Sequence, residues 1–151
     1  MKYSEGGVGR VFVLSLDDGD ELPAAIEDFA ADKGVSRGMC MLVGGIDDGG
    51  NIGVGPRDRE TMPPEPMLHK LDGVHEVAAV GTLFPGEDGR PRLHMHAALG
   101  REGETRAGCI RPGVSVWKLG EVILLEILGA NAARRFDPAT GFEMLQAEID
   151  D

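Results

Sequence analysis

The amino-acid sequence predicts an α+β domain in which one helix lies on a sheet of short strands. Glycine accounts for 23 of the 151 residues without recurring at a fixed period, which indicates many tight turns rather than a repeat architecture. Only residues 21–33 show the apolar spacing of a confident helix. Residues 93–110 read as a β-hairpin, because two short runs flank the turn-forming pair Glu102-Gly103. These three observations favour the α+β class.

The chain is expected to begin with a strand followed by its helix. Residues 10–16 are apolar and rich in β-branched side chains, and they end at the turn-forming sequence Asp17-Asp18-Gly19. Asp20 is expected to cap a helix over residues 21–33, which Gly34 ends. The apolar stripe of this helix is Leu22, Ile26, Phe29 and Ala30. Its carboxylates are expected to form a solvated face rather than a metal site: Glu27, Asp28 and Asp32.

Short apolar runs predict the remaining strands outside the hairpin: residues 38–43, 51–55, 67–71, 74–84 and 121–128. Residues 114–119 fit a strand or a helical turn. Residues 56–66 carry several prolines and charges and are expected to form an exposed connecting loop. The tail, residues 129–151, contains Pro138, which excludes a regular helix through it, so it is expected to pack irregularly over the domain.

Two of these strands are expected near the centre of the sheet. Residues 74–84 are largely apolar on both faces, which predicts a strand covered on each side. His75 and Glu76 must then point to opposite faces, and a polar side chain there is more often a core residue with a hydrogen-bond partner than a catalytic one. Residues 121–128 are the most hydrophobic run and are expected at the sheet centre.

The hairpin carries three side chains that can bind a metal. His94 and His96 project from the same strand face, because they are separated by one residue. If the turn is centred on Glu102-Gly103, paired residue numbers sum to 205 and Cys109 lies directly opposite His96. A slip of one residue would turn Cys109 to the other face. The proposed site therefore depends on the hairpin register.

Composition limits the classes of partner. At 16.0 kDa, residues 1–151 are expected to form a single domain. The formal charge of −11 disfavours non-specific binding to nucleic acid and to anionic membranes. The glycine-rich start, Gly6-Gly7-x-Gly9, precedes a strand rather than following one, which is the wrong context for a dinucleotide-binding loop.

The sequence predicts a soluble, cytoplasmic protein. Residues 1–9 contain no apolar segment typical of a secretion signal, and no run approaches the length of a membrane span. Cys40 and Cys109 are too few for a disulfide framework, so both are expected to be reduced. Cys40 is flanked by methionines and is expected in the core.

A set of motifs extends along nearly the whole chain. The most specific is His94-Met95-His96 after a Gly-x-Pro turn. The other elements are Gly9-Arg10, Asp18-Gly19-Asp20-Glu21-Leu22, Phe29-Ala30, Val43-Gly44-Gly45, Glu76-Val77, Gly81, Asp88-Gly89-Arg90-Pro91, Ala107-Gly108-Cys109, Arg135, Asp137, Thr140 and Gly141. In these motifs the chain resembles the plant-and-prokaryote-conserved (PPC) domain family in its single-domain prokaryotic form.

The resemblance implies a strongly bent antiparallel sheet flanked by a helix and assembled as a homotrimer. It also implies a metal site in which zinc, or another divalent transition metal, is held by the His-x-His pair and by a third histidine in a Gly-Gly-His motif. Here that motif reads Ala107-Gly108-Cys109, and a cysteine thiolate is itself a good zinc ligand. The implied ligands are therefore His94, His96 and Cys109.

Plant members of the family are associated with DNA through a separate AT-hook, and prokaryotic relatives often carry a DNA-binding label. Gly89-Arg90-Pro91-Arg92 resembles the core of an AT-hook, so Arg90 and Arg92 are the candidate DNA contacts. Asp88 stands where a flanking arginine is expected, and no further basic cluster surrounds the stretch. A structural turn is therefore the favoured interpretation.

Three classes of function remain open. The first is a trimeric metal-binding module of unassigned activity. The second is a metal-dependent hydrolase or lyase, with Glu76 as the candidate base. The third is a DNA-associated regulatory protein. Arg10, Arg135 and Asp137 match family positions and are expected to form ion pairs that fix the tail against the first strand or the subunit interface.

Overall fold

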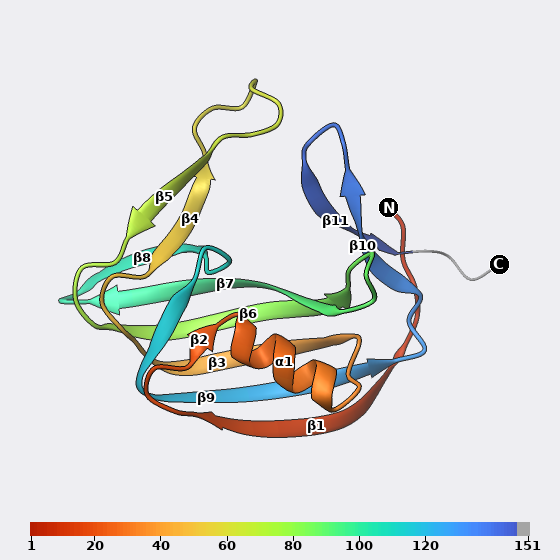
Figure 1. Ribbon diagram of the computed structural model, residues 1–151, viewed down its shortest axis with the longest axis horizontal. Helices are drawn as coiled ribbons and strands as arrows, with labels where there is room; N and C mark the ends of the chain where they lie inside the picture. Colours follow the sequence, from red (N-terminus) through yellow and green to blue (C-terminus); the bar gives the residue numbers. More distant parts are fainter. Residues whose placement is uncertain (148–151) are drawn as a thin grey trace.

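A bent antiparallel sheet forms the body of the molecule, and a single helix packs on one side of it (Figure 1). The computed structural model describes residues 1–147. The order of hydrogen-bonded strands is β1-β9-β3-β6-β7-β8-β4-β5, with β2 paired to β9, and β10 and β11 form a separate two-stranded sheet. The predicted α+β class and the bent antiparallel sheet are confirmed.

The elements have the following bounds: β1 Gly7–Leu16, β2 Glu21–Leu22, α1 Ala24–Asp32, β3 Gly38–Ile46, β4 Asn51–Pro56, β5 Pro66–Lys70, β6 His75–Pro85, β7 Pro91–Arg101, β8 Glu104–Cys109, β9 Val114–Leu128, β10 Ala132–Asp137 and β11 Phe142–Ala147. Within the described chain, no helix is long and apolar enough to cross a membrane.

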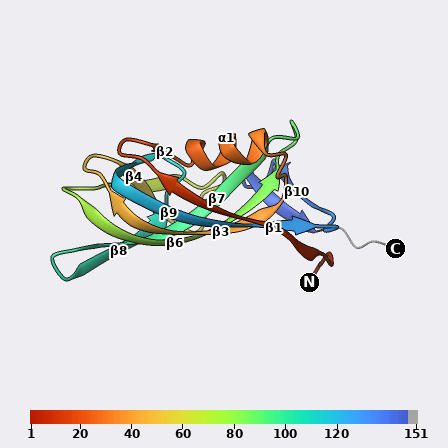
Figure 2. The ribbon, with the colours of Figure 1, turned by 90° about the horizontal axis from the view of Figure 1, so that it is seen from below.

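The core lies between α1 and the concave side of the sheet. Ile26 and Ala30 of α1 are completely buried, as the helical spacing predicted. They belong to one cluster with inward-facing strand residues, among them Leu42, Leu83, Leu99 and Leu124. Cys40 is also fully buried, which confirms its predicted place in the core. The helix therefore covers one face of the sheet only (Figure 2).

The predicted start of the helix is wrong. Glu21 and Leu22 pair with β9 as strand β2, so the helix begins only at Ala24, with Pro23 at its N-cap position. Asp20 does not cap the helix, because its carboxylate accepts a hydrogen bond from the backbone N–H of Asp17 at 2.9 Å and closes the preceding turn. Burial of Leu22 and its strand pairing outweigh the local capping signal.

Strand β6 is covered on one face rather than on both. Its inward residues, including His75 and Val77, are buried, whereas Glu76 and Val80 on the other face are exposed. His75 and Glu76 point to opposite faces as predicted, and His75 Nδ1 lies 2.8 Å from the carbonyl oxygen of Gly73. His75 is thus a core histidine with a hydrogen-bond partner.

The second half of the chain is more regular than expected. Residues 114–119 belong to the long strand β9, and residues 121–128 of this strand pair with β1 and β3 inside the sheet. The tail is not irregular over its described part, because β10 and β11 form a hairpin with Pro138 in its turn. The predicted tail also includes residues 148–151, which lie outside the described residues.

Among residues 1–147, Arg10, Arg135 and Asp137 form no ion pair that joins the tail to the first strand, and a role at a subunit interface stays a prediction. Arg10 pairs with Glu126 of β9 instead, with Nη2 and Oε1 2.7 Å apart. The Asp137 carboxylate accepts hydrogen bonds from Ala139 N–H at 3.2 Å and from the Thr140 hydroxyl at 2.7 Å, and so closes the β10–β11 turn. Arg135 donates to the carbonyl oxygen of Arg134 at 3.3 Å. Arg10 thus has its partner on a neighbouring strand, and Asp137 has its partners within its own turn.

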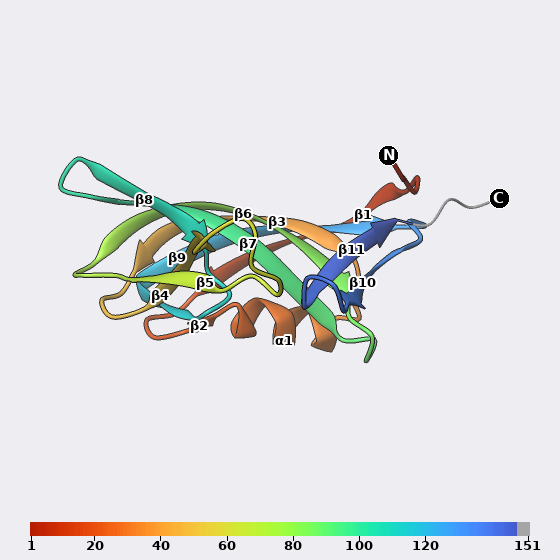
Figure 3. The same cartoon turned by 90° about the horizontal axis from the view of Figure 1, so that it is seen from above.

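The convex side of the sheet, which we name the outer sheet face, carries exposed apolar side chains: Val11, Val13, Met39, Met41, Val43 and Val80. Strand pairing connects part of this face into one row, Val13–Ile123–Met41–Val80–His96–Cys109, that crosses six strands. Figures 2 and 3 show that no helix of the described chain lies on this side.

Candidate metal centre

The β7–β8 hairpin brings three potential metal ligands onto the outer sheet face. Residues of β7 alternate between the core and this face, with Leu93, Met95 and Ala97 buried. His94 and His96 occupy the intervening outward positions, as the spacing predicted. Each is flanked by a buried residue on either side, so the packing of the core holds the backbone from which the two imidazoles project.

The register of the hairpin is the one predicted from its turn. Paired residues run from Arg101 and Glu104 to His96 and Cys109, and every pair sums to 205. Glu102 and Gly103 have φ angles of 53° and 83°, and a two-residue type I′ turn needs positive φ at both positions. Cys109 therefore lies directly across from His96.

The donor atoms converge closely enough to share one ion. The two Nε2 atoms of His94 and His96 are 3.1 Å apart, and the ligand atoms of the two histidines and Cys109 all lie within 4.8 Å of one another. Two nitrogen ligands on a tetrahedral zinc at about 2.0–2.1 Å are separated by about 3.3 Å. The spacing of the histidine nitrogens thus fits a tetrahedral ion.

The electrostatic surroundings favour the form of His94 that binds metals. Burial, followed by the charge of Arg111 and smaller contributions from His96 and Arg134, lowers the pKa of His94 to about 4. The imidazole is therefore neutral at physiological pH, with a lone pair free for an ion. Cys109 is a free, half-buried cysteine, which confirms that it is not held in a disulfide.

The three ligands lie at the floor of a cleft of about 710 Å³. One wall is formed by the β4–β5 region, including Pro56, Pro64 and Leu68, and the opposite wall by residues 142–145 of β11. The two hairpins rise on either side of this opening in Figure 1. The walls are mainly apolar, whereas the floor is polar.

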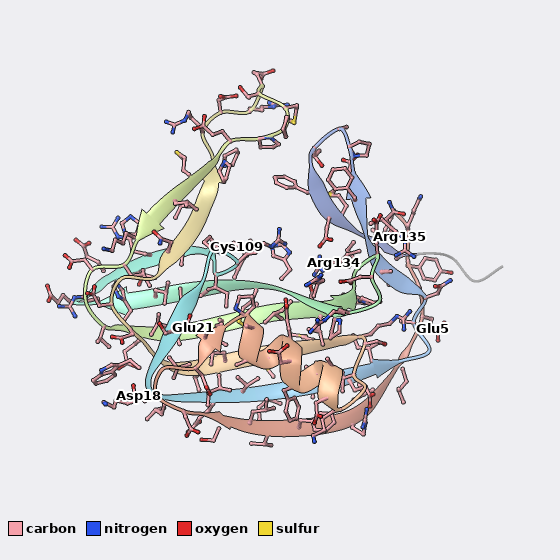
Figure 4. The ribbon with its side chains drawn as sticks, viewed as in Figure 1. Glu5, Asp18, Glu21, Cys109, Arg134 and Arg135 are labelled. Atoms are coloured by element: carbon pink, nitrogen blue, oxygen red, sulfur yellow. The ribbon has the colours of Figure 1, made fainter. Side chains whose placement is uncertain are left out.

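Two arginines share the floor with the ligands. Arg134 of β10 is 3% exposed, and Arg111, two residues beyond Cys109, is exposed within the cleft. Figure 4 shows Cys109 and Arg134 below the opening between the β4–β5 and β10–β11 hairpins. Arg134 Nη2 donates to both the carbonyl and the hydroxyl oxygen of Thr82, each at 3.1 Å, and thereby ties β10 to β6 beside His94.

Glu76, the candidate base, is not brought to this cluster. It lies on the outer sheet face of β6 but pairs with Gly100, whereas His96 pairs with Val80. Four residues of strand separate Glu76 from Val80, a distance of about 13 Å. A reaction at the cluster would need another base.

Arg90, a candidate DNA contact, lies in the turn between β6 and β7, and Arg92, the other candidate, lies at the start of β7. Each is paired with a carboxylate: Arg92 Nη2 is 2.7 Å from Asp88 Oδ2, and Arg90 Nη2 is 3.5 Å from Asp28 Oδ1. The backbone N–H of Gly86 donates to the carbonyl oxygen of Arg90 at 2.9 Å and closes the turn. The stretch thus contains the turn that the sequence predicted.

Sequence reasoning missed Arg111 and Arg134. Arg111 carried one weak signal, because it follows Cys109 by two residues. Arg134 follows the buried Ala132 at strand spacing, but this alternation is too short to identify a strand before Pro138. The family resemblance pointed instead to Arg135, the next residue of the strand, whose side chain is only partly buried.

The fold and nearly the whole length of the chain match solved structures. A metal-containing protein from Archaeoglobus fulgidus is 28% identical with a TM-score of 0.83, and the match covers 97% of this chain and 99% of that one. A PPC protein from Pyrococcus horikoshii is 22% identical with a TM-score of 0.79, covering 95% and 99%. A candidate DNA-binding protein from Ralstonia eutropha JMP134 is 18% identical with a TM-score of 0.67, covering 89% of each chain. The last two likenesses show the fold alone.

Sequence comparison extends the match to a family. A curated relative, the bifunctional protein GlmU of Synechococcus sp. (strain JA-3-3Ab), is 28% identical over 141 residues, which are 92% of this chain. The chain spans only 21% of the length of that relative. Residues 3–128 match the profile of the Plants and Prokaryotes Conserved (PCC) domain. Since this match takes in most of the chain and includes both histidines and the cysteine, the protein belongs to the PCC domain family, also written PPC.

Proposed function

We propose that the protein is a metal-binding module that holds zinc or another divalent transition metal through His94, His96 and Cys109. The observation that carries the proposal is the convergence of the three ligand atoms within 4.8 Å. Two imidazoles and a thiolate suit zinc, which binds nitrogen and sulfur ligands in tetrahedral sites. The metal-containing relative from Archaeoglobus fulgidus, similar over nearly the whole chain, supports it.

Three protein ligands leave one tetrahedral position for another group. This arrangement is typical of sites that exchange a bound molecule, whereas structural zinc sites have four protein ligands. The cleft gives solvent access to the open position. Because the thiol of Cys109 must stay reduced to act as a ligand, we place the protein in a reducing compartment, the cytoplasm.

We also propose that the protein assembles as a homotrimer through the outer sheet face. Six exposed aliphatic side chains on one sheet face form a surface of the kind that water-exposed monomers avoid. The row that contains Val13, Met41 and Val80 ends at His96 and Cys109. A second copy seated on this face would therefore approach the metal ligands.

The metal proposal is tested by elemental analysis of purified protein. Wild-type protein is expected to bind close to one equivalent of zinc per chain after dialysis against a metal-buffered solution, and His94→Ala to lose at least ten times in affinity. His69→Ala is the matched control, since His69 lies on β5 outside the ligand cluster. Wild-type protein that takes up no zinc, cobalt or nickel on titration would refute the site.

The two alternative functions have weaker support. A hydrolase or lyase would use the open coordination position, but Glu76 is too distant to serve as its base. A DNA-associated role would rely on Arg90 and Arg92, whose charges are balanced by Asp28 and Asp88 in a chain of formal charge −11. Binding of a DNA duplex at physiological salt that is lost in Arg92→Ala would reinstate the second alternative.

A further inference from the structure

Arg134 is a buried cation that has no carboxylate partner in the described part of the chain. Its guanidinium donates to three neutral oxygens, the two of Thr82 and the carbonyl of Arg92 at 3.4 Å. Among residues 1–147, no Asp or Glu oxygen lies within the 4.0 Å of an ion pair with it. Burying a charge without a counter-ion is costly, so the site favours an anion from outside.

A second cation strengthens the field at the same place. Arg111 lines the cleft beside His94 and makes no hydrogen bond or ion pair with the part of the chain that the structure describes. Burial lowers the pKa of Arg134, and the charge of Arg111 lowers it further. The carboxylate of Glu143 also lines the cleft and offsets this repulsion in part, but it does not pair with either arginine.

The walls of the cleft define the rest of the ligand. Apolar side chains face one another across the opening: Pro56, Pro64 and Leu68 on one wall, and Phe142, Met144 and Leu145 on the other. A charged floor beneath apolar walls is complementary to a molecule with an anionic head and an apolar body. The planar guanidinium fork of Arg111, which makes no hydrogen bond within residues 1–147, fits the paired oxygens of a carboxylate or a phosphate, while Arg134 adds its charge.

We propose that the cleft binds a small molecule whose oxyanion head group lies between Arg111 and Arg134 and takes the open coordination position, with its apolar body between β11 and the β4–β5 region. The inference rests on the proposed metal centre for the coordination contact. The charge complementarity of the two arginines is independent of the metal. Carboxylate and phosphate heads share this chemistry, and the experiment distinguishes them.

The test is calorimetric titration of zinc-loaded and metal-free protein with benzoate, phenyl phosphate and the neutral benzamide. We expect one oxyanion to bind at least about tenfold more tightly than benzamide, because only an oxyanion can accept charge-assisted hydrogen bonds from the arginines with both of its oxygens. The tighter of the two oxyanions identifies the head group. Metal-free protein should retain weaker binding, whereas equal binding of benzamide and both oxyanions would overturn the proposal.

Variants assign the contact. Arg111→Met is expected to weaken oxyanion binding about tenfold without changing zinc content, because Arg111 has no structural partner in the described chain. Arg59→Met is the control for lost positive charge, because Arg59 is an exposed loop residue. Unchanged oxyanion affinity in Arg111→Met with full zinc content would refute the inference and leave the metal centre standing. Wild-type protein that takes up no zinc but binds the oxyanion would refute the metal centre and leave the contact with the arginines standing.

Discussion

The contact between Arg10 and Glu126 is the strongest ion pair that the structure describes within the sheet. Arg10 Nε and Nη2 lie 2.8 Å and 2.7 Å from the two carboxylate oxygens, and the backbone N–H of Arg10 donates to Oε2 at 3.0 Å. These bonds hold the pKa of Glu126 at about 2, well below its ordinary value. The pair fastens edge strand β1 to β9.

This depressed pKa predicts how stability depends on pH. A carboxylate with a lower pKa in the folded state than in the unfolded state stabilises the fold above its unfolded pKa and loses that contribution as pH falls. Wild-type protein should therefore lose stability between about pH 5 and pH 2 more steeply than Glu126→Gln. Urea denaturation midpoints across this range measure the difference. Glu76→Gln, which removes an exposed carboxylate of β6, should follow the wild-type curve.

Cys109 provides a second prediction at the residue scale. Cys109→His restores the histidine that the family resemblance implies, so this variant should keep zinc, whereas Cys109→Ala should lose at least ten times in affinity. Cobalt-loaded wild-type protein should show thiolate-to-cobalt charge-transfer absorption. Cobalt-loaded Cys109→His should bind the ion without that band. If the band is missing from the wild type, sulfur is not a ligand.

At the scale of elements, the turn of the β7–β8 hairpin controls the metal centre. Both turn residues have positive φ, which a β-branched side chain adopts only with strain. Gly103→Val should lower the free energy of unfolding by about 1–2 kcal/mol and weaken zinc binding as the register is disturbed. Glu102→Asn should be neutral or slightly stabilising, since asparagine tolerates this conformation. Thermal unfolding and zinc titration of both variants check the prediction. If Gly103→Val is less stable than the wild type but binds zinc with the same affinity, strain at the turn does not disturb the pairing of the two strands.

The sequence predicted this hairpin well because its signals are local. A two-residue turn fixes the pairing of the strands it joins, so the opposition of His96 and Cys109 follows from the position of Glu102 and Gly103. The α-helix was recognised from its apolar spacing, but its start was misplaced because Leu22 pairs with a strand more than ninety residues away in the chain.

The cleft was not predictable in the same way. Its floor joins Arg134 of β10 to Thr82 of β6 across 52 positions, and no local pattern indicates that contact. Pro138 suggested irregular structure, although a proline in the turn of a hairpin leaves both strands intact. Arg134 was therefore hidden in a segment expected to pack irregularly, whereas the two histidines lie in a hairpin with local signals.

At the scale of the whole molecule, the outer sheet face explains why the sequence of β6 looked buried on both sides. Ala78 and Val80 are apolar but face outward in the single chain. Under the proposed trimer, Met41→Glu should lower the mass measured by sedimentation velocity from that of a trimer towards that of a monomer, because it places a charge in the interface. Met62→Glu makes the same change at an exposed residue of the 57–65 loop and should remain trimeric. Wild-type protein that sediments as a monomer would contradict the assembly.

The three proposed metal ligands lie within sixteen consecutive residues, from His94 to Cys109. Closing a loop of this length costs less conformational entropy than the pairing of Arg10 with Glu126, which are 116 positions apart. Contacts between near neighbours in sequence also form early in folding. The metal ligands can thus meet once the hairpin has closed, whereas Arg134 joins them only when the last strands have docked. We therefore expect the two halves of the proposed site to assemble in sequence: the hairpin that carries His94, His96 and Cys109 forms first, and Arg134 joins it last.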